Sequence, residues 1–229
     1  MHVVILPGWQ HNKTHWRNAS DALIASDIPH TILDIPGLGE EPIQPELNDI
    51  SSIAEWVKER IAVSIDDKVI ILVGHSYGGR IAAYITSKYP TFCKALILVG
   101  SPNLYMPTIR LRTQKFITHM FHPVISLVPE ALRTLVRSDD YKKVRGTELQ
   151  ELFTNIISDD QRALLQNIQV STLLVWGQND ADVPLFVANE IKKVVPHATL
   201  TVINNAGHNL HMEKSLLLAS TITAYVKNI

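Results

Sequence analysis

The segment Gly74–Gly78 reads G-H-S-Y-G, and it directly follows an apolar run at residues 69–73. A serine between two glycines, in a turn from a strand into a helix, is typical of an exposed nucleophile. The residues two before and two after such a serine pass so close to neighbouring backbone that only small ones fit. The following helix directs its first N–H groups and its partial positive charge toward a developing oxyanion. Ser76 is therefore the candidate nucleophile, and the matching chemistry is acyl transfer.

Two later segments complete a pattern in chain order. Residues 176–184 read W-G-Q-N-D-A-D-V-P, and residues 206–213 read A-G-H-N-L-H-M-E. With the G-x-S-x-G turn, they resemble the W-G-x-x-D-x-x-x-P and A-G-H-x-x-x-x-E segments of the α/β-hydrolase family, over nearly the whole chain. The resemblance implies that Asp180 is the acid and His208 the general base of a serine triad. It favours these two over their neighbours Asp182 and His211.

A serine nucleophile also needs two backbone donors for the anion that forms on the attacked carbonyl. The resemblance implies that the N–H groups of Tyr77 and Trp9 form this oxyanion hole. The family usually carries His-Gly-x after the first of these strands, whereas residues 7–9 of this chain read P-G-W. Despite this difference the backbone donor is present, because tryptophan at the third position has the N–H that proline would lack. The D-x-P-G-x-G segment at 34–39 also resembles the family, and we expect it to be a plain supporting turn.

The elements that must position these residues alternate along the chain. Six short runs rich in Val, Ile and Leu predict strands buried in a parallel sheet, and they span residues 3–6, 31–35, 69–73, 95–99, 172–176 and 199–203. Helical spacing predicts helices at 15–26, 53–65, 78–89, 185–195 and 213–226, with Ser51 or Ser52 as the N-cap of the second. We therefore expect a single α/β domain over 1–229, with about six mostly parallel strands flanked by helices. By comparison with the family, its two leading antiparallel strands are absent.

Residues 102–169 interrupt this alternation, because they contain helical patterns, such as 109–120 and 148–157, but no convincing strand. We expect a helical cap inserted over the carboxyl ends of the strands, where open α/β sheets bind ligands. The alternative is that these helices only cover one face of the sheet. The segment has no arginine cluster, and it contains several apolar residues: Leu104, Tyr105, Met106, Phe116, Met120 and Phe121. This composition indicates a small to medium, largely uncharged acyl substrate, unless these residues are only the cap's own packing core.

Composition excludes several classes of function. Lys and Arg number 21 against 22 Asp and Glu, which gives a net charge of -1 and no positive field to attract nucleic acid. No run approaches the roughly 18 apolar residues of a membrane span. The only cysteine, Cys93, is expected to be a buried, inert thiol in a reducing compartment. We expect a soluble cytoplasmic protein, a monomer or homodimer, with a small-molecule partner and neither nucleic acid nor membrane.

The expected reaction is hydrolysis of a carboxylic ester through an acyl-enzyme, without metal or organic cofactor. Zinc hydrolysis would need a dense motif such as H-E-x-x-H, and the pairs His11 with His15 and His208 with His211 lack an evident acidic third ligand. Dehalogenases and epoxide hydrolases of this fold use aspartate in place of the serine. A thioesterase, lactonase, carbon–carbon hydrolase or lyase with the same triad stays open, as does a small-ligand receptor with little turnover.

Overall fold

The computed structural model describes residues 1–66, 69–106 and 146–229. Its centre is a six-stranded sheet in the order β2-β1-β3-β4-β5-β6, and every neighbouring pair is parallel. The strands are β1 His2–Leu6, β2 His30–Ile32, β3 Ile70–His75, β4 Ala95–Val99, β5 Ser171–Gly177 and β6 Thr199–Ile203. The predicted fold class is confirmed, and all six predicted strands are present.

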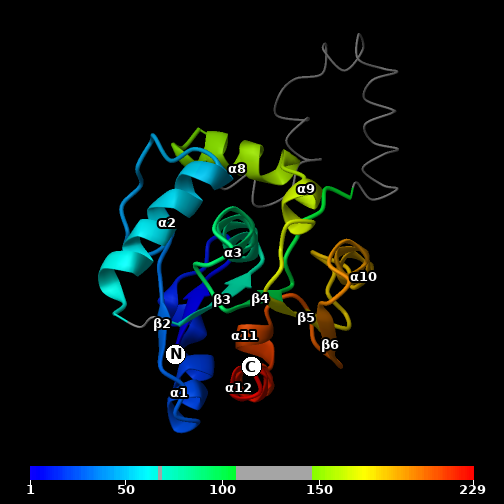
Figure 1. The fold of residues 1–229 in the computed structure, drawn as a ribbon. Coiled ribbons are helices and arrows are strands. Elements are labelled where there is room, and N and C mark those ends of the chain that lie inside the picture. Colours follow the sequence, from blue (N-terminus) through cyan, green and yellow to red (C-terminus); the bar gives the residue numbers. More distant parts are fainter. Residues whose placement is uncertain (67–68, 107–145) are drawn as a thin grey trace.

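Helices cover both faces of the sheet (Figure 1). One face carries α1 Arg17–Ala25, preceded by the 3-10 turn η1 Lys13–Trp16, together with α11 Leu210–Glu213 and α12 Ser215–Lys227. The other face carries α2 Ile50–Ser64, α3 Tyr77–Lys88, α8 Leu149–Ser158, α9 Arg162–Leu165 and α10 Phe186–Val194. Among the described residues, no helix is both long and apolar enough to cross a bilayer.

Two hydrophobic cores explain why the central strands are continuous apolar runs. In β4, Ala95, Ile97 and Val99 belong to the core beneath α1 and α12. Leu96 and Leu98 belong to the core beneath α2 and α3. Because side chains alternate between the two faces of a strand, a strand covered on both faces must be apolar at every position. The edge strand β6 differs from this expectation, since only one of its five residues is buried.

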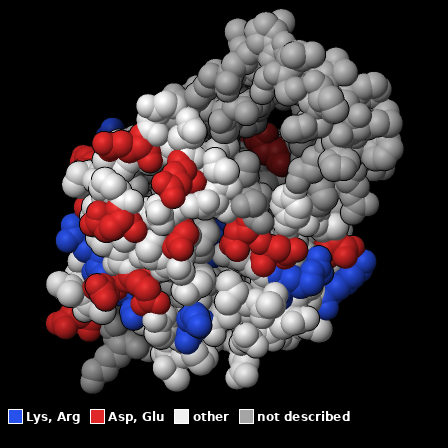
Figure 2. All heavy atoms as spheres, turned by 90° about the horizontal axis from the view of Figure 1, so that it is seen from above, with Lys and Arg blue, Asp and Glu red and all other residues white. Residues whose placement is uncertain are grey.

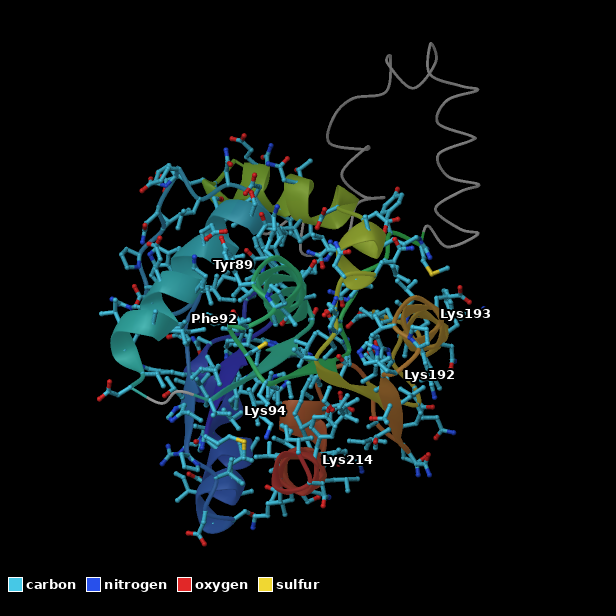
Figure 3. All side chains as sticks on the ribbon, viewed as in Figure 1. Tyr89, Phe92, Lys94, Lys192, Lys193 and Lys214 are labelled. Atoms are coloured by element: carbon cyan, nitrogen blue, oxygen red, sulfur yellow. The ribbon has the colours of Figure 1, made fainter. Side chains whose placement is uncertain are left out.

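The boundaries of α2 differ from the prediction. The helix begins at Ile50, three residues early, and its N-cap is Asp49 instead of Ser51 or Ser52. The Asp49 carboxylate accepts a hydrogen bond from the Ser52 backbone N–H at 2.7 Å, and the Ser52 hydroxyl completes a capping box. The next helix, α3, ends just before Tyr89, and the Tyr89 hydroxyl donates a hydrogen bond to Glu55 of α2 (Figure 3). The capping box thus fixes the start of α2, and the Tyr89–Glu55 hydrogen bond joins the end of α3 to α2.

Two other predicted elements are shorter than expected. Strand β2 ends at Ile32 because the chain turns there, and an isolated bridge joins Ile35 to Leu38. The predicted helix at 213–226 is interrupted at Lys214, whose backbone leaves the helical region, so α11 and α12 are separate. In both places the chain has left a strand and turns back to cover the sheet.

The segment predicted as a cap is described only at its two ends, 102–106 and 146–169. The predicted helix at 109–120 and the residues Phe116, Met120 and Phe121 lie outside the described residues. The two ends meet on α3: the Asn103 amide donates to Gln161 at 2.8 Å, and the Gln161 amide donates to the Arg80 carbonyl at 3.1 Å. Leu104 is 3% exposed and packs in the core. The segment is thus anchored on the helix that follows Ser76.

The strand order determines where a ligand site can form. Strand β1 lies between β2 and β3, so the chain leaves β1 toward one side of the sheet and later returns to the other. Connections that diverge in this way leave a crevice at the carboxyl ends of the strands. The loops that border this crevice follow β1 and β3, and they carry Trp9 and Ser76.

Candidate active site

Ser76 occupies a sharp turn between β3 and α3. Its φ of 50° and ψ of −114° lie outside the regions that non-glycine residues favour. A backbone of this kind typically costs about 1–3 kcal/mol and persists only where its surroundings hold it. Here the Ser76 N–H donates to the Val99 carbonyl at 2.9 Å, and the Ser101 hydroxyl donates to the Ser76 carbonyl at 3.0 Å. The strand next to β3 therefore holds the turn in place.

The glycines that flank Ser76 are required by close approach of the backbone. A Cβ at Gly78 would lie 2.1 Å from the Leu6 carbonyl oxygen, and one at Gly74 would lie 2.4 Å from the Gly79 Cα. Neither contact is possible without moving backbone. The small residues of the motif thus let α3 begin directly against the end of β1, which brings Ser76 to the crevice.

Asp180 and His208 form a hydrogen-bonded pair. The loop after β5 places the Asp180 Oδ2 atom 2.8 Å from His208 Nδ1. The other oxygen, Oδ1, accepts the backbone N–H groups of Asp182 at 3.0 Å and Val183 at 2.7 Å. Because a carboxylate only accepts, the proton of the pair lies on His208 Nδ1, and Nε2 keeps its lone pair. The side chain of Asp182 is exposed and takes no part in this pairing.

Two groups that the sequence interpretation did not assign hold the His208 loop. The Glu213 carboxylate accepts the N–H of Gly207 at 2.6 Å and of Asn209 at 3.1 Å. The His75 Nε2–H donates to the His208 carbonyl oxygen at 3.1 Å. Glu213 is the last letter of A-G-H-x-x-x-x-E, so the pattern contained a signal for it. His75 stands at a variable position of G-x-S-x-G and had none.

The two residues predicted for the oxyanion hole lie on either side of the crevice. Tyr77 is the first residue of α3, where a backbone N–H has no acceptor within its own helix. Trp9 follows β1, and its ring lies edge-on to the Tyr77 ring, with centroids 5.5 Å apart. The Trp9 ring also contacts the ring of Phe153 in α8, with the two ring centroids 5.1 Å apart. The segment after residue 145 therefore reaches the border of the site.

The D-x-P-G turn supports the loop after β1. The buried Asp34 carboxylate accepts the backbone N–H of Lys13 at 2.7 Å and of Glu40 at 3.2 Å. A single side chain thereby joins the turn after β2 to the chain that follows Trp9. This agrees with a supporting role, and Asp34 does not border the cavity described next.

A cavity of about 510 Å³ opens where these loops meet. Trp9, Ser76 and His208 all line it, Asp180 lies behind His208, and Tyr77 is buried beneath. The structure thus brings the five predicted residues together around one crevice. Its remaining lining comes from the loops after β1, β3, β5 and β6: Gln10, His11, His15, His75, Asp182, Val183 and Asn209.

Known proteins resemble this chain in sequence over most of its length, and solved structures resemble its fold. The sequence is 21% identical to monoacylglycerol lipase ABHD6 of Rattus norvegicus, over 99% of this chain and 75% of that protein. It is 25% identical to the pimeloyl-(acyl-carrier protein) methyl ester esterase of Aeromonas salmonicida, over 90% of this chain and 87% of that protein. The solved structure of a hydrolase from Oleispira antarctica superposes with a TM-score of 0.77 at 18% identity, covering 100% of this chain and 91% of the other. Because the model of the alpha/beta hydrolase family matches residues 3–220, the chain belongs to that family.

Proposed function

We propose that this protein is a serine hydrolase that cleaves carboxylic esters through an acyl-enzyme. The observation that carries the proposal is the 2.8 Å hydrogen bond between Asp180 and His208, beside a cavity that Ser76 also lines. The named relatives support the same class, since one is a lipase and the other an ester esterase. No step assigned below needs a metal ion or an organic cofactor.

The proposed reaction has two halves. His208 Nε2 takes the proton of Ser76 as its oxygen attacks the ester carbonyl, and Asp180 stabilises the imidazolium that forms. The N–H groups of Trp9 and Tyr77 stabilise the oxyanion. Collapse of this intermediate breaks the ester bond, and His208 gives its proton to the departing alcohol. Water then repeats the attack on the acyl-enzyme, with His208 as base, and releases the acid.

The surroundings of the cavity favour a small to medium, largely uncharged substrate. Trp9 and Val183 supply apolar surface, and its described lining contains no Lys or Arg to pair with a substrate anion. Lys192 and Lys193 are exposed residues of α10 (Figure 3), and neither lines the cavity. Figure 2 shows more acidic than basic side chains on the face over α2 and α8. An anionic substrate would gain little from this charge distribution.

We also propose that residues 102–169 form the cap of the site. The contact between Phe153 of α8 and Trp9 supports this assignment, since it places the end of the segment at the cavity border. A second anchor joins the segment to α3: the buried Arg80 guanidinium donates to the carbonyl of Asp159 at 2.9 Å.

Replacing the nucleophile tests the proposal. We expect Ser76→Ala to lower kcat for short-chain p-nitrophenyl esters by about 10⁴-fold or more, and to abolish labelling by a fluorophosphonate probe. Ser87→Ala is the matched control, since it removes a hydroxyl from the same helix, and both activity and labelling should stay within about twofold of the wild type. Profiling acyl length, thioesters and lactones defines the substrate class.

Two results would contradict the proposal. Turnover that survives Ser76→Ala would show that another group is the nucleophile. A wild type that is inert across the panel and resists the probe would instead favour a receptor that binds a small ligand in the same cavity. A marked preference for dianionic substrates would overturn the proposed substrate class alone.

A further inference from the structure

Three histidines from distant parts of the sequence meet beside the candidate active site. His11 follows β1, His75 ends β3 and His211 lies in α11. One ligating nitrogen from each lies within 4.8 Å of the other two. The ring centroids of His75 and His211 are 4.6 Å apart, and those of His11 and His211 are 4.9 Å apart. The three-histidine group therefore takes one member from each sequence pair, His11 and His211, and adds His75.

Two of these rings are buried with unused nitrogen atoms. His211 is fully buried, and neither of its ring nitrogens has a hydrogen-bond partner among the described residues. His75 is 1% exposed, and its Nδ1 likewise has no partner in that part of the chain. Buried polar atoms are normally paired, and an exception calls for a ligand or another explanation. Two such exceptions facing one another indicate a site.

The hydrogen bond of His75 prepares its free nitrogen for a ligand. Its Nε2–H donates to the His208 carbonyl, so Nδ1 carries the lone pair. Histidine ligands of metals commonly donate their other ring N–H to a backbone carbonyl in this way, which fixes the tautomer. A Cβ at Gly8 would lie 2.6 Å from this Nδ1 atom, so a larger residue at position 8 would crowd the nitrogen.

The protonation states suit a metal ion. Burial lowers the pKa of His211, and the neighbouring His11, His15 and His208 add to this by disfavouring an additional positive charge, so that the pKa is about 3. Burial, followed by His211, holds the pKa of His75 well below its usual range. Both imidazoles are therefore neutral near pH 7, the form that binds transition metals.

Only small movements of the three imidazole rings would bring their nitrogens to metal-binding distance. A point no more than about 2.8 Å from all three nitrogens exists when each pair lies within 4.8 Å, so ring shifts of about 0.7 Å reach the 2.0–2.1 Å of zinc–imidazole bonds. His11 and His75 line the open cavity, which gives an ion its entry path and a place for a water as fourth ligand. An all-imidazole set suits zinc, copper or nickel, whereas magnesium and calcium prefer oxygen ligands.

We propose that His11, His75 and His211 bind one divalent transition-metal ion, zinc in the first instance, beside the Ser76–His208 pair. The site is separate from the hydrolytic chemistry proposed above, and its existence does not depend on it.

Calorimetric titration of the untagged, chelator-treated protein with zinc chloride tests the site. We expect one ion per chain, and an affinity at least tenfold weaker in His211→Phe and in His11→Ala. The phenyl ring keeps the stacking against Trp16, whose ring centroid lies 4.7 Å from that of His211. The control His197→Ala removes an exposed histidine that lies outside the cluster and contacts the Val170 carbonyl, and this variant should bind zinc within twofold of the wild type.

A spectroscopic measurement identifies the ligands. Cu²⁺ bound to the wild type should show nitrogen couplings in electron paramagnetic resonance, and these should weaken in both cluster variants. His11 is only half-buried, so His11→Ala tests the site even where His211→Phe fails to fold. The proposal is overturned if the wild type binds no zinc at 100-fold excess over about 1 µM protein, or if both cluster variants bind as the wild type does. Neither result bears on turnover of esters.

Discussion

His208 and His211 lie three residues apart between β6 and α12, yet their environments are opposite. His208 lines the cavity and has a carboxylate, Asp180, on its Nδ1 atom. His211 is fully buried against Trp16 and has no carboxylate on either nitrogen among the described residues. A partner that fixes the tautomer, and access to the crevice, make the first a suitable general base. Burial without a partner suits the second to the proposed role of a neutral metal ligand.

The same contrast separates two sides of the crevice. On the side of the His208 loop, Asp180 pairs with His208 and Glu213 pairs with two backbone N–H groups. On the side where β3 ends, His75 and His211 keep ring nitrogens that have no hydrogen-bond partner among the described residues. Paired groups hold one geometry, whereas unpaired buried groups leave room for an added ion. The predictions below test this difference.

The largest expected effect comes from removing the carboxylate of the paired side. Asp180→Asn keeps Oδ1 as acceptor for the two loop N–H groups, but it turns an amide N–H toward His208 Nδ1. The imidazole then carries its proton on Nε2 and is unable to take one from Ser76. We expect kcat for p-nitrophenyl acetate to fall by about 10⁴-fold.

The matched control for that variant lies two residues away. Asp182→Asn changes an exposed carboxylate in the same loop, and kcat should stay within about threefold of the wild type. If the two variants lose activity to the same extent, the 2.8 Å pair is not the orienting interaction.

The buried His211 imidazole predicts that the stability of the protein depends on pH. The pKa of His211 is about 3 in the folded protein and about 6.5 in the unfolded chain. Below pH 6.5 the unfolded chain binds more protons, so the stabilising contribution present above this pH is lost as the pH falls. At pH 5 the loss from His211 amounts to about 2 kcal/mol. Replacing the imidazole by phenyl removes this term.

Urea unfolding with a chelator present measures the effect. Between pH 7.5 and pH 5, the free energy of unfolding should fall by about 2 kcal/mol more in the wild type than in His211→Phe. The burial of His75 lowers stability in acid in both proteins, whereas the part of its pKa shift that comes from His211 is lost in the variant. Equal losses in the two proteins would show that His211 takes up a proton while folded.

The smallest effect concerns the support of the His208 loop. Glu213→Gln keeps one oxygen acceptor but replaces the other with an amide nitrogen, so one of the two backbone N–H groups loses its partner. Hydrogen bonds to a charged group are worth about 1.5–3 kcal/mol, and we expect kcat to fall about tenfold as His208 loses its fixed position. Glu190→Gln, on α10, is the control that should leave kcat unchanged. An unaltered rate in both variants would mean that the loop holds its shape without Glu213.

Local patterns predicted the strands, most helices and the turn around Ser76, because each depends on residues that are close in sequence. The N-cap of α2 was placed incorrectly, since Ile50 is buried by tertiary packing that the helical spacing alone did not include. The break at Lys214 was missed for a similar reason. The choice of Asp180 over Asp182 came from the family pattern, and the burial of one and exposure of the other are consistent with it.

The sequence by itself determined an α/β sheet and a serine in a strand-to-helix turn, because side-chain periodicity and close-approach glycines are local requirements. Only the tertiary structure decided which histidines meet. His11, His75 and His211 are separated by 64 and 136 residues along the chain, and no spacing rule joins them. The parallel strand order brings the ends of β1 and β3 together and packs α11 beside them. Side chains at those ends become neighbours because the strands pair, whatever their distance in the sequence.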